Sequence, residues 1–233
     1  MPVRIRLRGG WVMLLHCETV PQLADGEWLC EDTLACLREL NEECLELCAA
    51  QGRAHGGHAT LIEIARLWRT LDGPARARAS DCLYLLVDAG FTASERWRRS
   101  SVSQVDEAVP DYAPFFTLPQ SAALAQAVLT FAWYLARSQA AAARLLLCMP
   151  AASVTDLAQH TLGQVRALAL RHPHWLQPRW AHSPGMWREL LSAAGAGEGP
   201  DLERARLRGQ RLLAAQLRSA GVAGRASRGA PPG

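Results

Sequence analysis

Four side chains in the first third of the chain are of types that bind transition metals. Cys44 and Cys48 stand one helical turn apart, and His55 and His58 follow in a glycine-rich stretch. A structural zinc ion takes four such ligands in a tetrahedron. However, both cysteines fall on an apolar stripe, where cysteine acts as a small buried hydrophobe, and the spacing fits no standard zinc motif. We expect no bound metal or cofactor, and a zinc-dependent protein is the minor alternative.

The sequence offers little that would support catalysis. It contains no G-x-S-x-G nucleophile motif, no P-loop and no G-x-G-x-x-G turn. His16 and Cys17 are the only adjacent imidazole and thiol. A catalytic pair needs the base to face the nucleophile, and side chains of adjacent residues point in different directions. We therefore predict a protein that is not an enzyme and has no catalytic residue.

Arginine and tryptophan gather between residues 166 and 188. An indole and a guanidinium stack well, and a guanidinium binds phosphate. If the protein contacts DNA, these arginines would supply the phosphate contacts, although no base-reading helix is recognisable. The alternative is that the tryptophans pack a small domain and the arginines lie outside it. The candidate phosphate contacts are Arg166, Arg171, Arg179 and Arg188.

Two helix-start signals precede these arginines. Ser153 stands three residues before Asp156, and Thr161 stands three residues before Gln164. In a capping box the first side chain accepts a hydrogen bond from a backbone amide of the new helix, while the second reaches back to the start. The pattern predicts two short helices joined near His160.

Apolar residues at helical spacing predict further helices. Alternating apolar and basic residues at 1–10 indicate a strand by their period, but no partner for it is recognisable, so this segment is an arm of unassigned structure. The stretch 74–89 is apolar almost all round in its second half, which favours a fully buried helix ending at Gly90. Together the expected helices cover 32–52, 60–71, 74–89, 121–137, 140–149, 153–159, 161–172, 183–195 and 201–220.

The helices after residue 120 carry apolar faces interspersed with alanine. Small residues let helices approach closely, which suits a bundle seam or a dimer interface. We therefore expect these faces to mediate assembly with another protein or a second copy. The candidate interface residues are Leu124, Val128, Leu135, Leu145, Leu162, Val165 and Leu168.

Composition favours helices and a protein that stays inside the cell. Of 233 residues 49% are apolar, and every one of the 25 Lys or Arg residues is arginine. The basic excess lies after residue 200, which permits contact with a polyanion without demanding it. Seven cysteines form no C-x-x-C pair and leave one over if all were bridged, which indicates reduced thiols. With no recognisable signal peptide and no long apolar run, we expect a cytoplasmic location and no membrane partner.

One segment resembles a known family. Pairs of residues at 157–158, 161–162, 164–165 and 168–169 give the spacing LA-x-x-TL-x-QV-x-x-LA, followed by Leu176 and Arg179-Trp180. This pattern resembles FlhD, the D subunit of the bacterial flagellar master transcriptional regulator, in which a leucine-rich helix precedes it; here that helix would be 140–149. The resemblance covers residues 140–191. Pro150, the tryptophan-rich segment and the long N-terminal extension depart from the family's pattern.

The resemblance implies an all-helical, dimerising regulator that works with a second, zinc-carrying subunit to bind promoter DNA. On this basis we expect a non-enzymatic bacterial transcriptional regulator, an activator, that acts through helix-mediated assembly and DNA association. Its partners would be a protein or a second copy, and DNA, with no small-molecule substrate evident. The alternative is a helical adaptor or scaffold of a secretion or other protein assembly that does not bind DNA.

For the fold, the sequence predicts an all-α protein. It would form two small helical domains or one irregular multi-helix bundle, plus a basic C-terminal helix and a disordered tail. The boundaries are an N-terminal helical domain at 1–100, a Pro/Ser-rich linker at 101–119, an FlhD-like helical domain at 120–195, and the basic helix and tail at 196–233.

Overall fold

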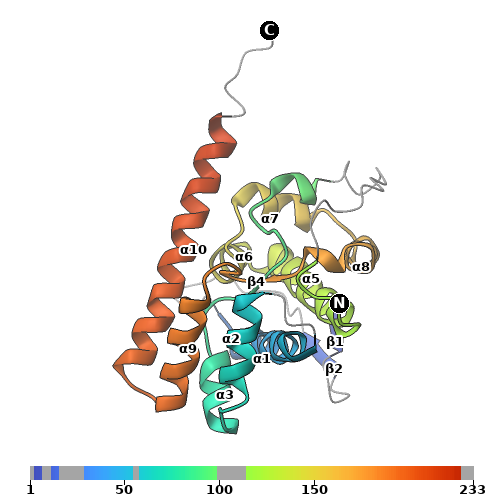
Figure 1. Cartoon of the computed structure of the whole chain (residues 1–233). Helices are drawn as coiled ribbons and strands as arrows, with labels where there is room; N and C mark the ends of the chain where they lie inside the picture. The colour runs from blue at the N-terminus through green and yellow to red at the C-terminus, as the bar shows by residue number, and fades with distance from the viewer. Residues whose placement is uncertain (1–2, 7–11, 16–28, 55–57, 99–113, 227–233) are drawn as a thin grey trace.

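The computed structural model describes residues 3–6, 12–15, 29–54, 58–98 and 114–226. The expected all-α fold is confirmed in this part of the chain (Figure 1). No described helix is both long enough and apolar enough to cross a bilayer. The α-helices are α1 (Glu31–Ala54), α2 (Ala59–Trp68), α3 (Gly73–Ser80), α5 (Gln120–Ser138), α6 (Ala140–Leu147), α7 (Ala151–Ala158), α8 (Leu162–Arg171), α9 (Pro184–Ala196) and α10 (Pro200–Ala226).

Short strands and turns join these helices. Strand β1 (Val3–Arg6) pairs antiparallel with β2 (Val12–Leu15), so the segment that indicated a strand by its period finds its partner in the residues that follow. A second small sheet joins β3 (Val87–Asp88) to β4 (Gln177–Pro178). Single 3₁₀ turns lie at Ser94–Trp97 and Pro173–Trp175.

One hydrophobic core runs through the whole body. It contains residues from every α-helix and joins residues before and after the predicted 101–119 linker. Helices α1 and α5 cross its centre (Figure 1): α1 packs on α2, α3 and α5, and α5 packs on α6, α7 and α8. Within the linker, Phe116 is buried and the Gln51 side chain binds the Thr117 and Leu118 backbone amides. The two predicted helical domains therefore share a core.

The prediction of a helix at 74–89 is wrong for the second half of that range. Helix α3 begins as expected, with the Asp72 side chain accepting from the Ala75 amide, but it ends at Ser80. The chain then runs through the core without a helix to β3 and reaches Gly90 at φ +74°. Polar side chains from other elements bind the backbone here and replace the helical hydrogen bonds, as described below.

The two capping signals differ in outcome. Thr161 and Gln164 form the expected capping box at the start of α8, with the Gln164 amide donating to Thr161 Oγ1 at 3.2 Å. The Ser153 cap is wrong, because α7 begins directly after Pro150 and Ser153 lies buried inside it, 3.3 Å from Ser94 Oγ. Proline supplies the helix start without a side-chain cap.

The C-terminal helices run slightly longer than expected. Helix α9 starts at Pro184 as predicted and passes Gly195 by one residue before Gly197 takes φ +114°. Helix α10 continues through 221–226, where the sequence predicts a disordered tail; residues 227–233 lie outside the described part. Figure 1 shows α10 along one side of the molecule, beside α9, with its C-terminal half extending past the other helices.

Close packing of α1 on α2 depends on Gly52. A Cβ at this position would lie well inside van der Waals contact with the Leu61 carbonyl. Gly52→Ala is therefore expected to destabilise the fold by about 1–3 kcal/mol, because backbone cannot move aside as a flexible side chain can. Gly73→Ala is the matched control, since a Cβ there meets nothing within 4 Å. Urea unfolding of both variants measures the difference, and equal midpoints would contradict this packing.

Candidate interaction surface

In the potential zinc site, the two cysteines are buried in the core, whereas the described histidine packs elsewhere. Cys44 and Cys48 are completely buried on α1, where burial raises the pKa of the Cys48 thiol well above its ordinary value. His58 instead stacks on Phe115, with ring centroids 4.0 Å apart. His55 lies outside the described residues, and within them no three His, Cys, Asp or Glu side chains gather as metal ligands do.

Arg179 is not a phosphate contact, because its side chain is 4% exposed and fully used inside the protein. Its Nε donates to the Leu85 carbonyl at 2.8 Å, and its Nη2 donates to the Leu147 carbonyl at 2.6 Å. Nη1 lies 3.8 Å from the Asp88 carboxylate. A guanidinium has five donors in a rigid fork, so one buried arginine can bind several backbone carbonyls at once.

Asn41 completes this buried polar network from α1. Its Nδ2 donates to the carbonyls of Ser80 and Tyr84, and its Oδ1 accepts from the Leu86 amide at 2.7 Å. A buried peptide group without a partner costs about 1–3 kcal/mol, so a non-helical segment can cross the core only if side chains supply the bonds. Asn41 and Arg179 do so for the segment between α3 and β3.

The other three arginines do not form one face with each other. Arg166 and Arg171 are exposed on α8, whereas Arg188 is exposed on α9, on the other side of the body (Figure 1). Arg188 Nε binds Glu63 of α2 at 2.6 Å. The predicted phosphate contacts are therefore dispersed, and Arg188 joins two helices of its own chain.

Six of the seven candidate interface residues lie in or against the core of the single chain. Five are buried in the packing of α5 and α8 and Leu162 is half-buried against it, because the apolar faces of these helices meet each other. These six residues therefore pack within the single chain and do not form the predicted interface with another molecule. Only Leu145 of the set is exposed, at 57%. The five buried residues are Leu124, Val128, Leu135, Val165 and Leu168.

Helix α10 has one buried face that ends before the helix does. Leu202, Ala205, Gly209 and Leu213 face the body, and Gly209 lets the helix lie directly on the Tyr84 and Trp180 rings. From residue 214 to 219 every residue is exposed except the half-buried Leu217. In the stretch 214–219, therefore, Leu217 alone packs against the core.

A groove of about 830 Å³ lies between residues 212–219 of α10 and the segment 177–183. One wall carries Leu212, Ala215, Gln216 and Ser219 of α10. The other wall includes Trp180, whose backbone φ is +50°. Sequence reasoning missed this groove, because two segments about thirty residues apart form it; the only signal was the basic helix at one side.

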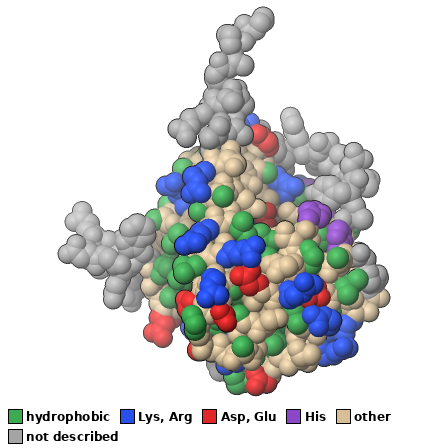
Figure 2. Space-filling model, turned by 60° about the vertical axis from the view of Figure 1, so that its left-hand side comes forward, with side chains coloured by type: hydrophobic (Ala, Val, Ile, Leu, Met, Phe, Trp, Pro, Cys, Tyr) green, Lys and Arg blue, Asp and Glu red, His purple; other side chains and the backbone are tan. Residues whose placement is uncertain are grey.

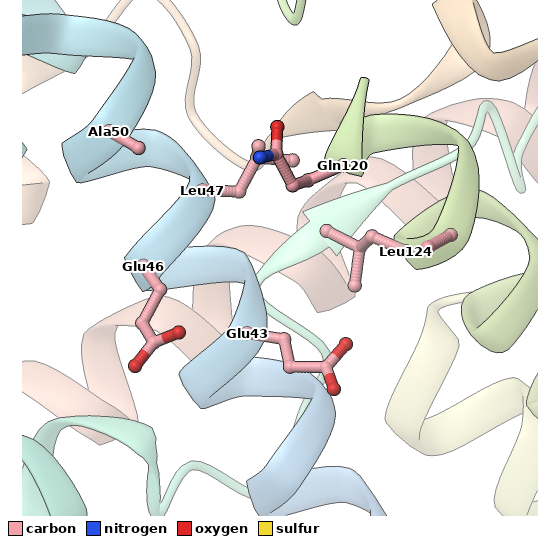
Figure 3. Close-up of a pocket in the computed structure, with 7 residues that line it drawn as sticks. Glu43, Glu46, Leu47, Ala50, Gln120 and Leu124 are labelled. Atoms are coloured by element: carbon pink, nitrogen blue, oxygen red, sulfur yellow. The ribbon is translucent and has the colours of Figure 1, made fainter. Parts of the chain in front are cut away.

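A smaller hollow of about 140 Å³ lies between α1 and α5. Figure 3 shows Glu43 extending toward the side of α5 that carries Leu124, and Leu47 meeting Gln120. Its acidic rim and apolar floor differ from the groove at α10, which has arginines beside it. It is also much smaller, so it offers less surface to a macromolecular partner.

A third cluster stacks basic groups on Trp175. The His172 ring lies parallel to the indole with centroids 4.3 Å apart, and the Arg96 guanidinium lies over the ring at 5.0 Å. Burial lowers the pKa values of His172 and His174, and the neighbouring positive groups lower them further. Both imidazoles therefore favour the neutral form near pH 7.

A scan of protein-family models and searches of curated proteins and of solved structures find no match to the chain. Two features of the chain's own geometry bear on its function. One is the set of helix faces that pack on each other inside the chain, and the other is the stretch 214–219 of α10, which is exposed except for Leu217.

Arg179→Met is expected to destabilise the protein by about 3–5 kcal/mol, because it leaves the Leu85 and Leu147 carbonyls without their donor and the Asp88 carboxylate without its neighbouring cation. Arg166→Met is the control, since Arg166 is exposed on α8 and the sequence predicts the same phosphate-contact role for both arginines. Guanidinium unfolding followed by circular dichroism provides the measurement. Similar stability of the two variants would contradict a structural role for Arg179.

Glu63→Gln is expected to destabilise the protein by about 1 kcal/mol at pH 7, after allowance for solvent screening. Hydrogen bonds from Arg66 and from Arg188 lower the Glu63 pKa from 4.5 to about 2. A lowered pKa stabilises the fold above pH 4.5, and this contribution is lost as the pH falls toward 2. Urea midpoints of the two proteins should converge over that range, with exposed Glu42→Gln as control. A difference in urea midpoint that stays constant over this pH range would contradict the lowered pKa of Glu63.

Proposed function

We propose that this protein is a non-enzymatic helical adaptor that holds another protein through the exposed stretch 214–219 of α10. The observation that carries the proposal is that Leu213 is the last fully buried residue of α10 in the described part, and that residues 214–219 are exposed except for the half-buried Leu217. Most of the stability of a helix in a protein comes from packing an apolar face. A partner laid against residues 214–219 would supply the packing that the chain itself does not.

The distribution of the predicted contacts supports an adaptor more than a DNA-binding regulator. Arg179 is buried, Arg188 pairs with Glu63, and the two arginines of α8 lie on a different side from α9. DNA binding needs several cations that face one phosphate track. The apolar positions of α5 and α8 are used in the core, whereas residues 214–219 of α10 are exposed except for Leu217.

A second candidate function is the FlhD-like transcriptional regulator that the sequence resemblance implies. Two observations favour it: the Thr161–Gln164 capping box at the start of α8, and the burial of Leu157, Val165 and Leu168, which belong to the resembling pattern. In that case DNA association would be shared with a partner subunit. The arginines of α10 would be the additional cations available to it.

Two measurements on the full-length protein distinguish these functions. We expect a tagged chain purified from its native host to retain one protein at near-stoichiometric amount, and to keep it in 0.5 M salt as apolar packing does. We also expect weak binding to a random DNA duplex. Recovery of the chain alone, together with DNA binding that weakens steeply with added salt, would overturn the adaptor proposal and favour the regulator.

A further inference from the structure

We infer that the groove between α10 and the segment 177–183 binds an acidic amphipathic helix of a partner protein. This inference rests on the adaptor function proposed above and adds the site and the chemistry of the partner. The groove has the features that helix recognition needs: an apolar floor, a rigid wall and a charged edge.

The apolar part of the groove, called its floor here, consists of Pro178, Trp180 and Ala181 on one side and Leu212 and Ala215 on the other. Leu212 is 38% exposed although it is a large apolar residue on a helix that packs against the body. Polar side chains, including Gln177, Gln216 and Ser219, line the rest of the groove. Such a surface binds the apolar stripe of an amphipathic segment and leaves its polar face in water.

The wall at Trp180 is held rigidly in an uncommon conformation. A bulky residue at φ +50° is a backbone outlier, and such positions persist where the surroundings fix them. The Ser183 amide donates to the Trp180 carbonyl at 2.7 Å, and the indole packs edge-on against Tyr84 and Trp187. The indole N–H of Trp180 has no acceptor among the described residues. The groove is therefore preformed and needs little ordering to bind.

The face of α10 beside the groove is positively charged, and Asp88, the one acid that lines the groove among the described residues, lies 3.8 Å from the buried Arg179 guanidinium. Residues 204, 208, 211 and 218 are arginines at spacings of four, three and seven, which places them in one stripe along α10. Arg204 pairs with Asp201 and Arg208 with Glu189. Arg211 and Arg218 are exposed and form no ion pair in the described part, and the sequence has no acidic residue after Glu203. Figure 2 shows several basic side chains, with acidic ones among them, on the side of the molecule where Figure 1 places α10.

Charge complementarity indicates which kind of partner binds in the groove. A second copy of the chain would bring one arginine stripe against another, which like charges disfavour. A nucleic acid would satisfy the arginines but would leave the apolar residues Trp180, Leu212 and Ala215 uncovered. An acidic amphipathic helix matches both features, because its apolar stripe fills the floor while its carboxylates reach Arg211 and Arg218.

A photo-crosslinking residue at Gln216 of the full chain, expressed in its native host, tests this inference. We expect a crosslink to a peptide of another protein with leucines at helical spacing and several Asp or Glu residues. The same residue at exposed Thr155 on α7 is the control and should not give it. Reversing the charges of Arg211→Glu and Arg218→Glu should lower the yield at least about tenfold, whereas Arg166→Glu should not, because charge complementarity governs the encounter.

Each other outcome overturns the inference. A crosslink to a second copy of this chain, to a nucleic acid or to a basic peptide would assign the groove to a different occupant. An acidic peptide whose yield does not respond to charge reversal would remove the role of the arginines. If the full chain retains a protein partner but Gln216 gives no crosslink, the adaptor function stands and the groove assignment fails. If the chain retains no protein at all, both fail.

Discussion

The fold depends on how the backbone between α3 and β3 is satisfied inside the core. This segment carries peptide groups through an apolar interior, where each unpaired group would cost about 1–3 kcal/mol. Asn41 from α1 binds it on one side, and Arg179, which follows β4, binds it on the other. The Leu146 carbonyl accepts from the Leu85 amide, and the Leu86 carbonyl accepts from the Arg179 amide. Elements from both ends of the chain are thereby joined at one place.

The same network determines the shape of the candidate binding surface. Arg179 precedes Trp180, and its carbonyl accepts from the Trp187 indole at 2.9 Å, so the groove wall is continuous with the buried network. Tyr84, which belongs to the segment that Asn41 binds, lies under Gly209 of α10. The position of α10 and the geometry of the groove therefore follow from a core interaction. This relation explains how a small set of buried polar groups can position a surface for recognition.

Local signals in the sequence predict most of the helices but not the path between them. The capping box at Thr161 is a local signal and is confirmed, and the helix predicted at 183–195 is found as α9 within one residue at each end. The stretch 74–89 has a helical composition, yet its second half is not a helix, because its hydrogen bonds come from Asn41 and Arg179, which are distant in sequence. Ser153 follows a proline that already starts the helix, so its capping spacing carries no information.

The candidate binding groove also depends on contacts between residues that are distant in sequence, so local patterns do not predict it. A pattern of arginines and tryptophans does not tell which arginine is buried, and Arg179 resembles Arg166 in sequence while their environments are opposite. Likewise, apolar stripes on 121–137 and 161–172 predict packing without saying whether the partner helix belongs to the same chain. The groove needs residues from 177–183 and 212–219 together, and only their spatial arrangement brings them side by side.

The long-range hydrogen bonds hold the buried segment between α3 and β3 as firmly as the rest of the core. Native-state hydrogen exchange at the amides of Leu85, Leu86 and Arg179 measures how firmly it is held. We expect these three amides to exchange only through global unfolding, with a free energy equal to that from denaturant unfolding. Exchange of the three at the low free energies of surface loops, while α1 and α5 stay protected, would contradict it.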